Sequence, residues 1–220
     1  MKKIYAVIGL GRFGSSIAET LAAAGHEVLV VDSDEVRVQE ISKALIHAVV
    51  ADSTDKIVLK SLGIRNFDVV IVAIGQNVQA SVLTTLLLKE LGVKYVVARA
   101  DRFLHGKMLE KVGADRVVFP ERDMGKRVAH NLMSTNVIDY FEVAPDLGII
   151  EVKVPCQFVN ASLIHSNLRQ AYGITVLAIR RKDQFLLSPN PEERFLEGDQ
   201  LILVGESESL QRFEAKYTDQ

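Results

Sequence analysis

The chain has 220 residues, of which 48% are hydrophobic and 25% are charged, and its formal net charge is −2. This length and composition predict one large globular domain or two small ones. The nearly balanced charge excludes the broad basic surface that general binding to DNA or RNA requires. The single cysteine, Cys156, excludes an intramolecular disulfide and a thiolate metal cluster, and it is typical of a reducing cytoplasm.

The first residues resemble the start of a signal peptide, because Lys2 and Lys3 precede an apolar run. That run ends within about five residues, at Gly9, and is shorter than the core of a signal peptide. We therefore expect a β-strand here. No apolar stretch approaches the ~20 residues of a membrane-spanning helix, so we expect a cytoplasmic protein that meets any membrane only through a partner.

The first ~120 residues alternate between short runs rich in Val and Ile and segments with helical spacing. The predicted strands are Ile4–Ile8, Val28–Val31, Ala48–Ala51, Val69–Ala73, Tyr95–Ala98 and Val117–Phe119. Apolar residues recur at helical intervals between them, and glycines follow the ends of the helical segments. Repeated βαβ units predict an α/β fold, a Rossmann-type doubly wound parallel sheet with helices on both faces.

The pattern changes after Pro120. One amphipathic helix is predicted from Glu121 to about Tyr140, and a break follows at Pro145, Asp146 and Gly148. We therefore divide the chain into a nucleotide-binding domain (1–123), a connecting helical segment (124–144) and a C-terminal α+β domain (145–220).

The C-terminal domain is predicted to contain strands at Ile149–Val154 and Gln200–Val204, a helix at Leu163–Tyr172, and a hairpin of Thr175–Arg181 with Phe185–Leu187. Its supply of apolar residues is small, so we expect it to bury one face against a second copy of the chain.

The residues Gly9-Leu10-Gly11-Arg12-Phe13-Gly14 match the G-x-G-x-x-G pattern and lie between a predicted strand and a predicted helix. In this setting the first glycine permits a tight turn, the second admits a phosphate, and the third allows the helix to pack against the strand. The helix N-terminus then attracts an anion. The segment predicts a site for a phosphate-containing ligand.

Further candidates follow the other strands. Asp32, with Ser33 after it, ends the second strand, where an acid binds ribose hydroxyls and repels a 2′-phosphate. Asp52 and Ser53 follow the third strand and Ala73-Ile74-Gly75 the fourth, at the edge where ligands collect in such sheets. The alternative is that these last five are ordinary turn residues.

Arg12 lies inside the glycine turn. A guanidinium there can pair with phosphate oxygens, and an additional cation suits a ligand with a terminal phosphate, such as ATP. The alternative is that it points to solvent.

A dehydrogenase would need an acid or base close to the nicotinamide. None of His26, His47, His105, His130 and His165 lies at a recognisable spacing from a carboxylate, and we expect His105 and His130 at solvent-exposed helical positions. The sequence therefore favours a protein that binds a nucleotide without catalysis. An NAD(H)-binding oxidoreductase or redox sensor remains the alternative.

Several segments, in order, resemble one known family. VIGLGRFG, VLVVD, GIRNFDVVIVAIG, KVGADRVVFPERDMG, SPNP and EGDQLILVG together resemble the regulatory subunits of bacterial Ktr and Trk potassium-uptake systems, which are RCK proteins. The resemblance covers essentially the whole chain and is strongest for Ktr-type subunits. It implies an RCK N-domain and C-domain, and a homo-octameric ring, built from dimers, on the cytoplasmic face of a membrane potassium translocator.

The resemblance also implies ligands. ATP or ADP would bind the N-domain, with Arg12 facing the terminal phosphates, partly across the dimer interface, Asp32 holding the ribose and Asp52 and Ser53 beside the base. Arg99 matches a basic position near the phosphates. Glu121 matches an acid that holds Na⁺, Mg²⁺ or Ca²⁺; the alternative is that it is only a helix N-terminal acid.

The C-domain of Ktr-type members resembles a receptor for cyclic di-AMP, which would lie at the interface of a dimer. The candidate residues for this effector are Ile164, Leu168, Arg169, Ile174 and Pro191. The alternative is that Ile164, Leu168 and Ile174 belong to the hydrophobic core.

Overall fold

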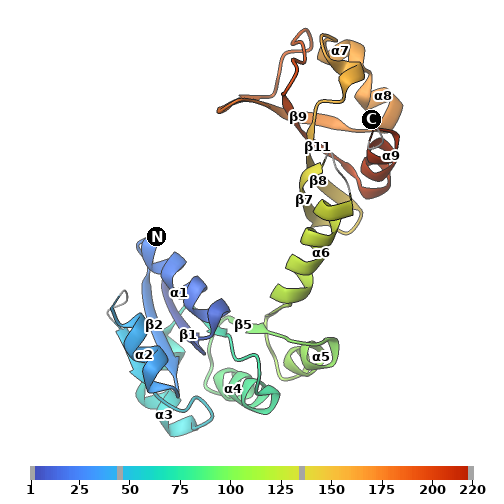
Figure 1. Ribbon diagram of the computed structural model, residues 1–220. Helices are drawn as coiled ribbons and strands as arrows, with labels where there is room; N and C mark the ends of the chain where they lie inside the picture. The colour runs from blue at the N-terminus through green and yellow to red at the C-terminus, as the bar shows by residue number, and fades with distance from the viewer. Residues whose placement is uncertain (1–2, 44–46, 134–136, 218–220) are drawn as a thin grey trace. The chain divides into compact units, whose positions relative to one another are not determined.

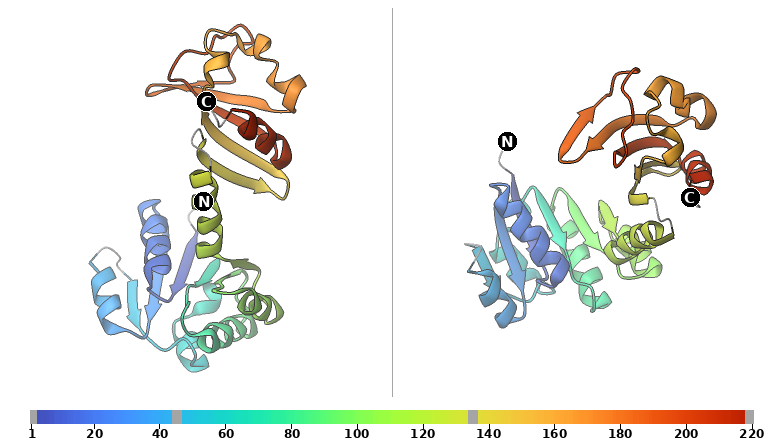
Figure 2. Two further views of the ribbon diagram at one scale, coloured as in Figure 1. Left: turned by 45° about the vertical axis from the view of Figure 1, so that its right-hand side comes forward. Right: turned by 45° about the horizontal axis from the view of Figure 1, so that its top comes forward.

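The structure is a computed structural model that describes residues 3–43, 47–133 and 137–217. The chain forms two compact units, Met1–Arg122 and Asp123–Gln220, and each is described by itself. Figure 1 and Figure 2 show both units along the chain.

The described residues of the first unit contain a parallel sheet in the order β3-β2-β1-β4-β5-β6. Its strands are β1 (Ile4–Ile8), β2 (Glu27–Asp32), β3 (His47–Val50), β4 (Val69–Val72), β5 (Val96–Arg99) and β6 (Arg116–Val118). Every predicted strand is confirmed, with its ends within one residue of those expected. The order reverses between β1 and β4, and in doubly wound sheets this reversal is where a ligand crevice opens.

Helices cover both faces of this sheet. They are α1 (Arg12–Ala23), α2 (Glu35–Ile41), α3 (Lys56–Ser61), α4 (Val78–Glu90) and α5 (Phe103–Lys111), with a short 3₁₀ turn, η1 (Ile64–Asn66). Successive side chains of a strand point to opposite faces, so alternate residues of β1 enter two different cores. Ala6 and Ile8 pack with Leu88 of α4, whereas Val7 packs with Ala18 of α1.

The long helix predicted after Pro120 is shorter than expected. Helix α6 runs from Pro120 to Met133, and Val137–Ala144 forms strand β7. Both the helix to Tyr140 and a connecting helical segment as far as residue 144 were therefore wrong. Strand β7 pairs with β8 (Leu147–Lys153) in an antiparallel ladder, and this backbone pairing decides the structure of the segment in spite of its helical spacing.

The second unit has an antiparallel sheet in the order β10-β9-β11-β8-β7 among its described residues. The remaining strands are β9 (Thr175–Arg181), β10 (Gln184–Leu187) and β11 (Gln200–Glu206). The hairpin of β9 and β10 was predicted correctly, and its turn places Lys182 at a φ of 54°. The sheet with its helices is the expected small α+β domain.

The helices of the second unit differ from expectation in two respects. The predicted helix Leu163–Tyr172 is divided into α7 (Leu163–Ser166) and α8 (Leu168–Tyr172), because Asn167 adopts a left-handed conformation. Helix α9 (Ser207–Tyr217) was not predicted; it lies along the sheet in both figures, and its Leu210 and Phe213 are buried with Ile150. The unit also contains a short 3₁₀ turn, η2 (Cys156–Phe158).

Candidate functional site

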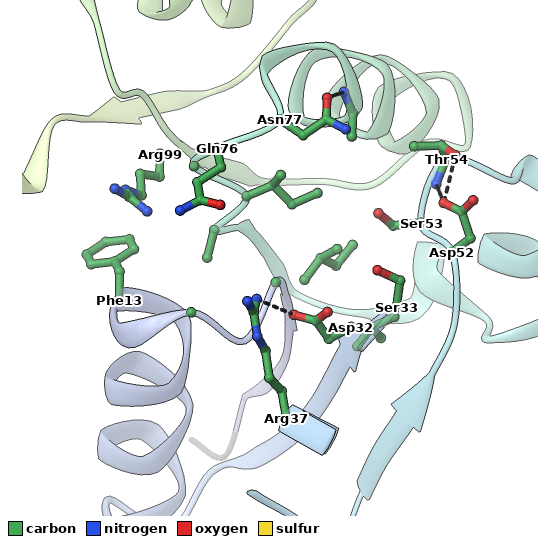
Figure 3. Close-up of a pocket in the computed structure, with 18 of the residues that line it drawn as sticks. Phe13, Asp32, Ser33, Arg37, Asp52, Ser53, Thr54, Gln76, Asn77 and Arg99 are labelled. Atoms are coloured by element: carbon green, nitrogen blue, oxygen red, sulfur yellow. Dashed lines mark hydrogen bonds and ion pairs between the residues drawn. The ribbon is translucent and has the colours of Figure 1, made fainter. Parts of the chain in front are cut away.

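A cavity of about 830 Å³ opens at the carboxyl ends of the parallel strands of the first unit, where the strand order reverses. Figure 3 shows its lining side chains. Asp32 and Asp52 lie toward one end and Arg99 and Phe13 toward the other. The lining residues are Ile8, Gly9, Gly11, Arg12, Phe13, Val31, Asp32, Ser33, Arg37, Ala51, Asp52, Ser53, Thr54, Ala73, Ile74, Gly75, Gln76, Asn77, Ala80, Arg99 and Glu121.

The glycine turn packs tightly at two of its three glycines. Gly9 has a φ of 98°, in the left-handed region that favours glycine. A methyl group on Gly14 would lie 1.9 Å from the carbonyl oxygen of Gly9, so only glycine lets α1 start this close to the turn. A methyl group on Gly11, by contrast, would meet nothing within 4 Å. Gly11 therefore faces the open cavity, whereas Gly14 is buried.

Helix α1 begins at Arg12, and Gly11 at its N-cap position offers no side chain to its first N–H groups. The first intrahelical bond in this region is donated by the Ser15 N–H to the Gly11 carbonyl, at 2.9 Å. Backbone donors of the first turn therefore remain available to an anion in the cavity. The Arg12 side chain is exposed at the same end of the helix and lines the cavity.

Asp32 ends β2 and is only 9% exposed. Its carboxylate accepts the Leu10 N–H at 2.5 Å and the Asp34 N–H at 2.9 Å. The Arg37 guanidinium lies 3.8 Å from the same carboxylate, and Figure 3 draws this ion pair between two of the lining residues. An ionised carboxylate has about four acceptor positions, so Asp32 retains capacity to accept a hydroxyl group.

Asp52 and Ser53 have different roles in the loop after β3. The Asp52 carboxylate accepts the Thr54 hydroxyl at 2.7 Å and the Thr54 N–H at 2.8 Å, and these bonds lower the pKa of Asp52. Asp52 is exposed, whereas the Ser53 hydroxyl is buried and bonded to Thr84 of α4 at 2.9 Å. Asp52 therefore both stabilises its turn and presents a carboxylate to the cavity.

At the other end of the cavity, Arg99 at the end of β5 lies over Gly75. A methyl group on Gly75 would come within 2.2 Å of the Arg99 guanidinium. The Arg99 Nη2 forms an ion pair with Glu121 in the first turn of α6. Asn77 caps α4 by accepting the Ala80 N–H at 2.9 Å, and both residues line the cavity, so the N-terminus of a second helix borders it.

The structure brings most of the predicted residues together around one cavity. Of the residues predicted for the nucleotide and its cation, only Leu10 and Gly14 do not line it: the Leu10 side chain is buried, and Gly14 is the packing glycine. Sequence analysis missed Ile8, Val31, Arg37, Ala51, Thr54, Gln76, Asn77 and Ala80. Some of these could have been predicted. Gln76 and Asn77 directly continue the loop after β4, and Arg37 lies in the first turn of α2, shortly after Asp32.

The cavity offers few ligands for a permanently bound metal ion. Among the described residues, no group of three or more His, Cys, Asp and Glu side chains is arranged to hold an ion. Glu121, the predicted cation ligand, is already paired with Arg99. Any cation at this position would need oxygen ligands from a bound phosphate in addition to Glu121.

The five residues predicted for a second effector separate into two groups. Ile164, Arg169 and Pro191 are exposed, and the Ile164 N–H donates to the Pro191 carbonyl at 2.9 Å. Leu168 and Ile174 are 2% and 1% exposed and belong to the core of the second unit. This burial agrees with the alternative that the two side chains belong to the hydrophobic core, and their contact with the effector stays a prediction.

His105 was expected to be exposed and is instead buried between α4 and α5. Its Nδ1 accepts the Asp101 N–H at 3.3 Å, and its Nε2 lies 3.2 Å from the Ser81 hydroxyl. Burial lowers the pKa of His105. The residue does not line the cavity, so it packs the helices together without facing a ligand.

Across the described stretches of the chain, no helix combines the length and apolar character needed to cross a bilayer.

Comparison with known proteins matches both units. Residues 5–120 match the TrkA-N domain and residues 147–217 the TrkA-C domain. The chain is 48% identical to Ktr system potassium uptake protein C of Bacillus subtilis over 98% of each chain. It is 46% identical to Ktr system potassium uptake protein A of the same organism over 96% of each.

Among solved structures, the RCK domain of GsuK covers all of this chain and 48% of its own, with a TM-score of 0.70 and 19% identity. Structures of GsuK bound to NAD and to ADP match with TM-scores of 0.53 and 0.51 and identities of 24% and 20%. They cover 99% and 57% of this chain, and 38% and 33% of their own chains. At these identities the likeness is one of fold. The two domain matches and the Bacillus relatives together show that the chain belongs to the family of Ktr and Trk potassium-uptake proteins with RCK domains.

Proposed function

We propose that the chain is a nucleotide-sensing subunit that regulates a membrane potassium translocator, with ATP or ADP bound in the cavity of the first unit. The observation that carries this proposal is the polarity of the cavity. Acceptor carboxylates, Asp32 and Asp52, lie toward one end, and Arg99 lies toward the other with Phe13, from the first turn of α1. A nucleoside phosphate has the same polarity, with hydroxyl donors on its ribose and negative charge on its phosphates.

In this proposal Asp32 accepts the ribose hydroxyls, Asp52 faces the base, and the first turn of α1 binds the phosphates. Arg12 is exposed at the cavity and can reach a phosphate that extends beyond the turn. ATP and ADP would then favour different conformations, because only ATP carries the group that Arg12 binds. The shift can be no larger than the difference in affinity that this contact creates.

The subunit would act without catalysis, in the cytoplasm, as part of a homo-octameric ring of dimers on its membrane partner. The names of the Bacillus relatives support a role in potassium uptake. Cyclic di-AMP at a C-domain dimer interface remains part of the proposal, with Arg169 and the exposed Ile164 and Pro191 as its contacts. Exposed apolar side chains on the second unit, including Phe185 and Leu187, fit the predicted dimerisation.

The second candidate is NAD(H) binding, as in a redox sensor or oxidoreductase. The observations that favour it are the ribose-type acid Asp32 and a cavity volume of about 830 Å³, which accommodates a dinucleotide. Arg12 distinguishes the two candidates, since a terminal phosphate is present in ATP and absent from NAD.

Calorimetric titration of the purified chain with ATP, ADP and NADH tests the proposal. A charge-assisted hydrogen bond is worth about 1.5–3 kcal/mol, so Arg12→Ala should weaken ATP binding about tenfold or more and ADP binding much less. Arg65→Ala is the matched control, because Arg65 is exposed and lies outside the cavity. Equal losses for ATP and ADP would remove Arg12 from the mechanism. Tight NADH binding without binding of ATP or ADP would favour the second candidate.

A further inference from the structure

Pro191 occupies the second position of a β-turn, 190–193, on the surface of the second unit. The Glu193 N–H donates to the Asn190 carbonyl at 2.8 Å, and the Asn190 side chain accepts the Glu192 N–H at 3.0 Å. The Ile164 N–H donates to the Pro191 carbonyl at 2.9 Å. One backbone hydrogen bond therefore joins the two residues whose exposed apolar side chains are proposed to contact the effector.

Arg181, the last residue of β9, ties the end of this turn to the interior of the unit. Its Nη1 donates to the Glu193 carboxylate at 2.9 Å and its Nη2 to the Arg194 carbonyl at 2.9 Å. Its Nε and Nη2 also donate to the two oxygens of Asp199, at 3.0 and 2.9 Å. The Asp199 carboxylate is buried and accepts the Leu196 N–H at 2.9 Å. The guanidinium therefore joins the surface turn to a carboxylate that is itself fixed.

The two ion pairs of Arg181 differ in burial. The Asp199 side chain is 1% exposed, whereas that of Glu193 is 32% exposed. Breaking a buried pair is costly, because it leaves a buried charge without a partner. A partly exposed pair contributes little to stability, because water screens it. The pair with Glu193 is therefore of small importance for the fold, although it is the side-chain contact that fixes the turn.

We propose that Arg181 is a positioning residue for the cyclic dinucleotide: acting through Glu193, it holds Pro191 beside Ile164 so that both side chains are in place to contact an adenine base. This inference rests on the effector site proposed for the second unit and adds to it the residue that shapes that site. Arg181 acts through the turn and does not itself touch the ligand.

The spacing of the two apolar side chains matters for affinity. A gap of about 1 Å between a base and an apolar side chain forfeits up to about half of their dispersion attraction. A turn that is already held in its binding conformation also avoids the cost of being ordered when the ligand arrives. The brace from Arg181 to Glu193 supplies both conditions before binding.

The test is a calorimetric titration of the full chain with cyclic di-AMP. Glu193→Ala removes the brace and leaves the buried pair with Asp199 in place. Glu192→Ala is the matched control, because Glu192 is exposed on the same turn and is not the residue that Arg181 binds. Each variant removes one negative charge, which favours an anionic ligand equally. Glu193→Ala should therefore bind cyclic di-AMP about three- to tenfold more weakly than Glu192→Ala.

Two further measurements separate positioning from a loss of stability. Glu193→Gln makes the same charge change but keeps an acceptor oxygen for Arg181, so it should recover most of the affinity. Thermal melts of all three variants should lie within about 5 °C of the parent chain. Hydrogen exchange, followed by mass spectrometry without ligand, should show faster exchange of the Ile164 N–H in Glu193→Ala than in Glu192→Ala.

Three results would overturn the proposal: equal affinities in Glu193→Ala and Glu192→Ala, a loss that Glu193→Gln does not recover, or a loss without faster exchange at Ile164. If the parent chain binds cyclic di-AMP and one of these results is found, only the positioning role fails. If the parent chain does not bind cyclic di-AMP, the effector site itself fails, and the positioning role fails with it. Titration of the same chain with ATP and ADP then decides separately about the nucleotide site of the first unit.

Discussion

Two functions of the glycine turn are the close packing of α1 and the admission of a phosphate. They can be separated by adding a methyl group at Gly14 or at Gly11. On Gly14 a methyl group would lie 1.9 Å from a backbone oxygen, where ordinary contact begins at 3.4 Å, so α1 would have to retreat by roughly 1.5 Å (3.4 − 1.9). Overpacking of this kind costs about 1–3 kcal/mol. We expect Gly14→Ala to fall in the upper half of that range, because the atom it meets is backbone and cannot rotate away.

On Gly11 the methyl group would enter open space, and the backbone φ of −72° suits any L-residue. Alanine is a poorer N-cap than glycine, so Gly11→Ala should cost under about 1 kcal/mol of folding free energy. Its methyl group projects where a phosphate would approach the turn, so ADP affinity should fall while the fold persists.

Thermal melts by circular dichroism and calorimetric titration with ADP measure the two effects. For a unit of about 120 residues, 1 kcal/mol corresponds to roughly 4 °C in Tm. Gly14→Ala should therefore melt roughly 8–12 °C below the parent chain, and Gly11→Ala within about 4 °C of it. Equal losses of Tm in the two variants, or a Gly14→Ala chain as stable as the parent, would refute the assignment of separate roles.

Two further predictions concern titrating groups. The hydrogen bond from Arg127 lowers the pKa of Asp139 from 3.8 to about 2, so its stabilisation is present above pH 4 and is lost as pH falls toward 2. Asp139→Asn should cost about 1–2 kcal/mol at pH 7, after allowance for solvent screening, and should flatten the loss of Tm between pH 4 and pH 2.5 in circular dichroism melts. His105 has a lowered pKa because it is buried, so the unfolded chain takes up a proton below pH 6.5 that the folded chain resists, and stability falls there. Fluorimetric melts of His105→Gln should show a smaller decrease in Tm between pH 7.5 and pH 5.5 than the parent.

Each of these predictions has an outcome that contradicts it. If Asp139→Asn loses Tm at low pH as the parent chain does, a carboxyl group other than Asp139 would carry the lowered pKa. A His105→Gln chain with an unchanged pH slope would mean that another group takes up the proton. The exposed residue His165 supplies the control, because His165→Gln should leave that slope in place.

The parallel sheet was predictable because its central strands β1, β2 and β4 bury consecutive residues on both faces, and unbroken Val and Ile runs are typical of that environment. Strand β7 was missed because its apolar residues continue the helical spacing of α6. The β-branched and aromatic side chains of Val137, Ile138, Tyr140 and Phe141 were the available signal. The break between α7 and α8 depends on Asn167, a residue type that tolerates left-handed backbone but does not require it.

The candidate site was predictable where chain order alone decides position. Residues that directly follow a strand, such as Ser33 and Gly75, lie at the ligand edge by topology. Arg37 and Ala80 come from the first turns of helices, and whether such a side chain faces the cavity depends on where the helix begins. For Leu168 and Ile174 the sequence could not decide between the two interpretations, because an apolar residue has the same appearance whether it contacts a ligand or the core.

The hydrogen bond from the Leu10 N–H to Asp32 joins the acid at the end of β2 to the glycine turn at the end of β1. An acid at this position therefore holds the loop in shape even when no ribose is present. Substitution of Asp32 would disturb the turn and the ligand contact together, so a loss of binding in such a variant would not identify a ribose bond. For proteins built in this way, an acid after the second strand is in part a folding residue. A related chain that no longer binds a nucleotide would still need this acid for the shape of its turn. The motif therefore indicates the fold more directly than it indicates a ligand.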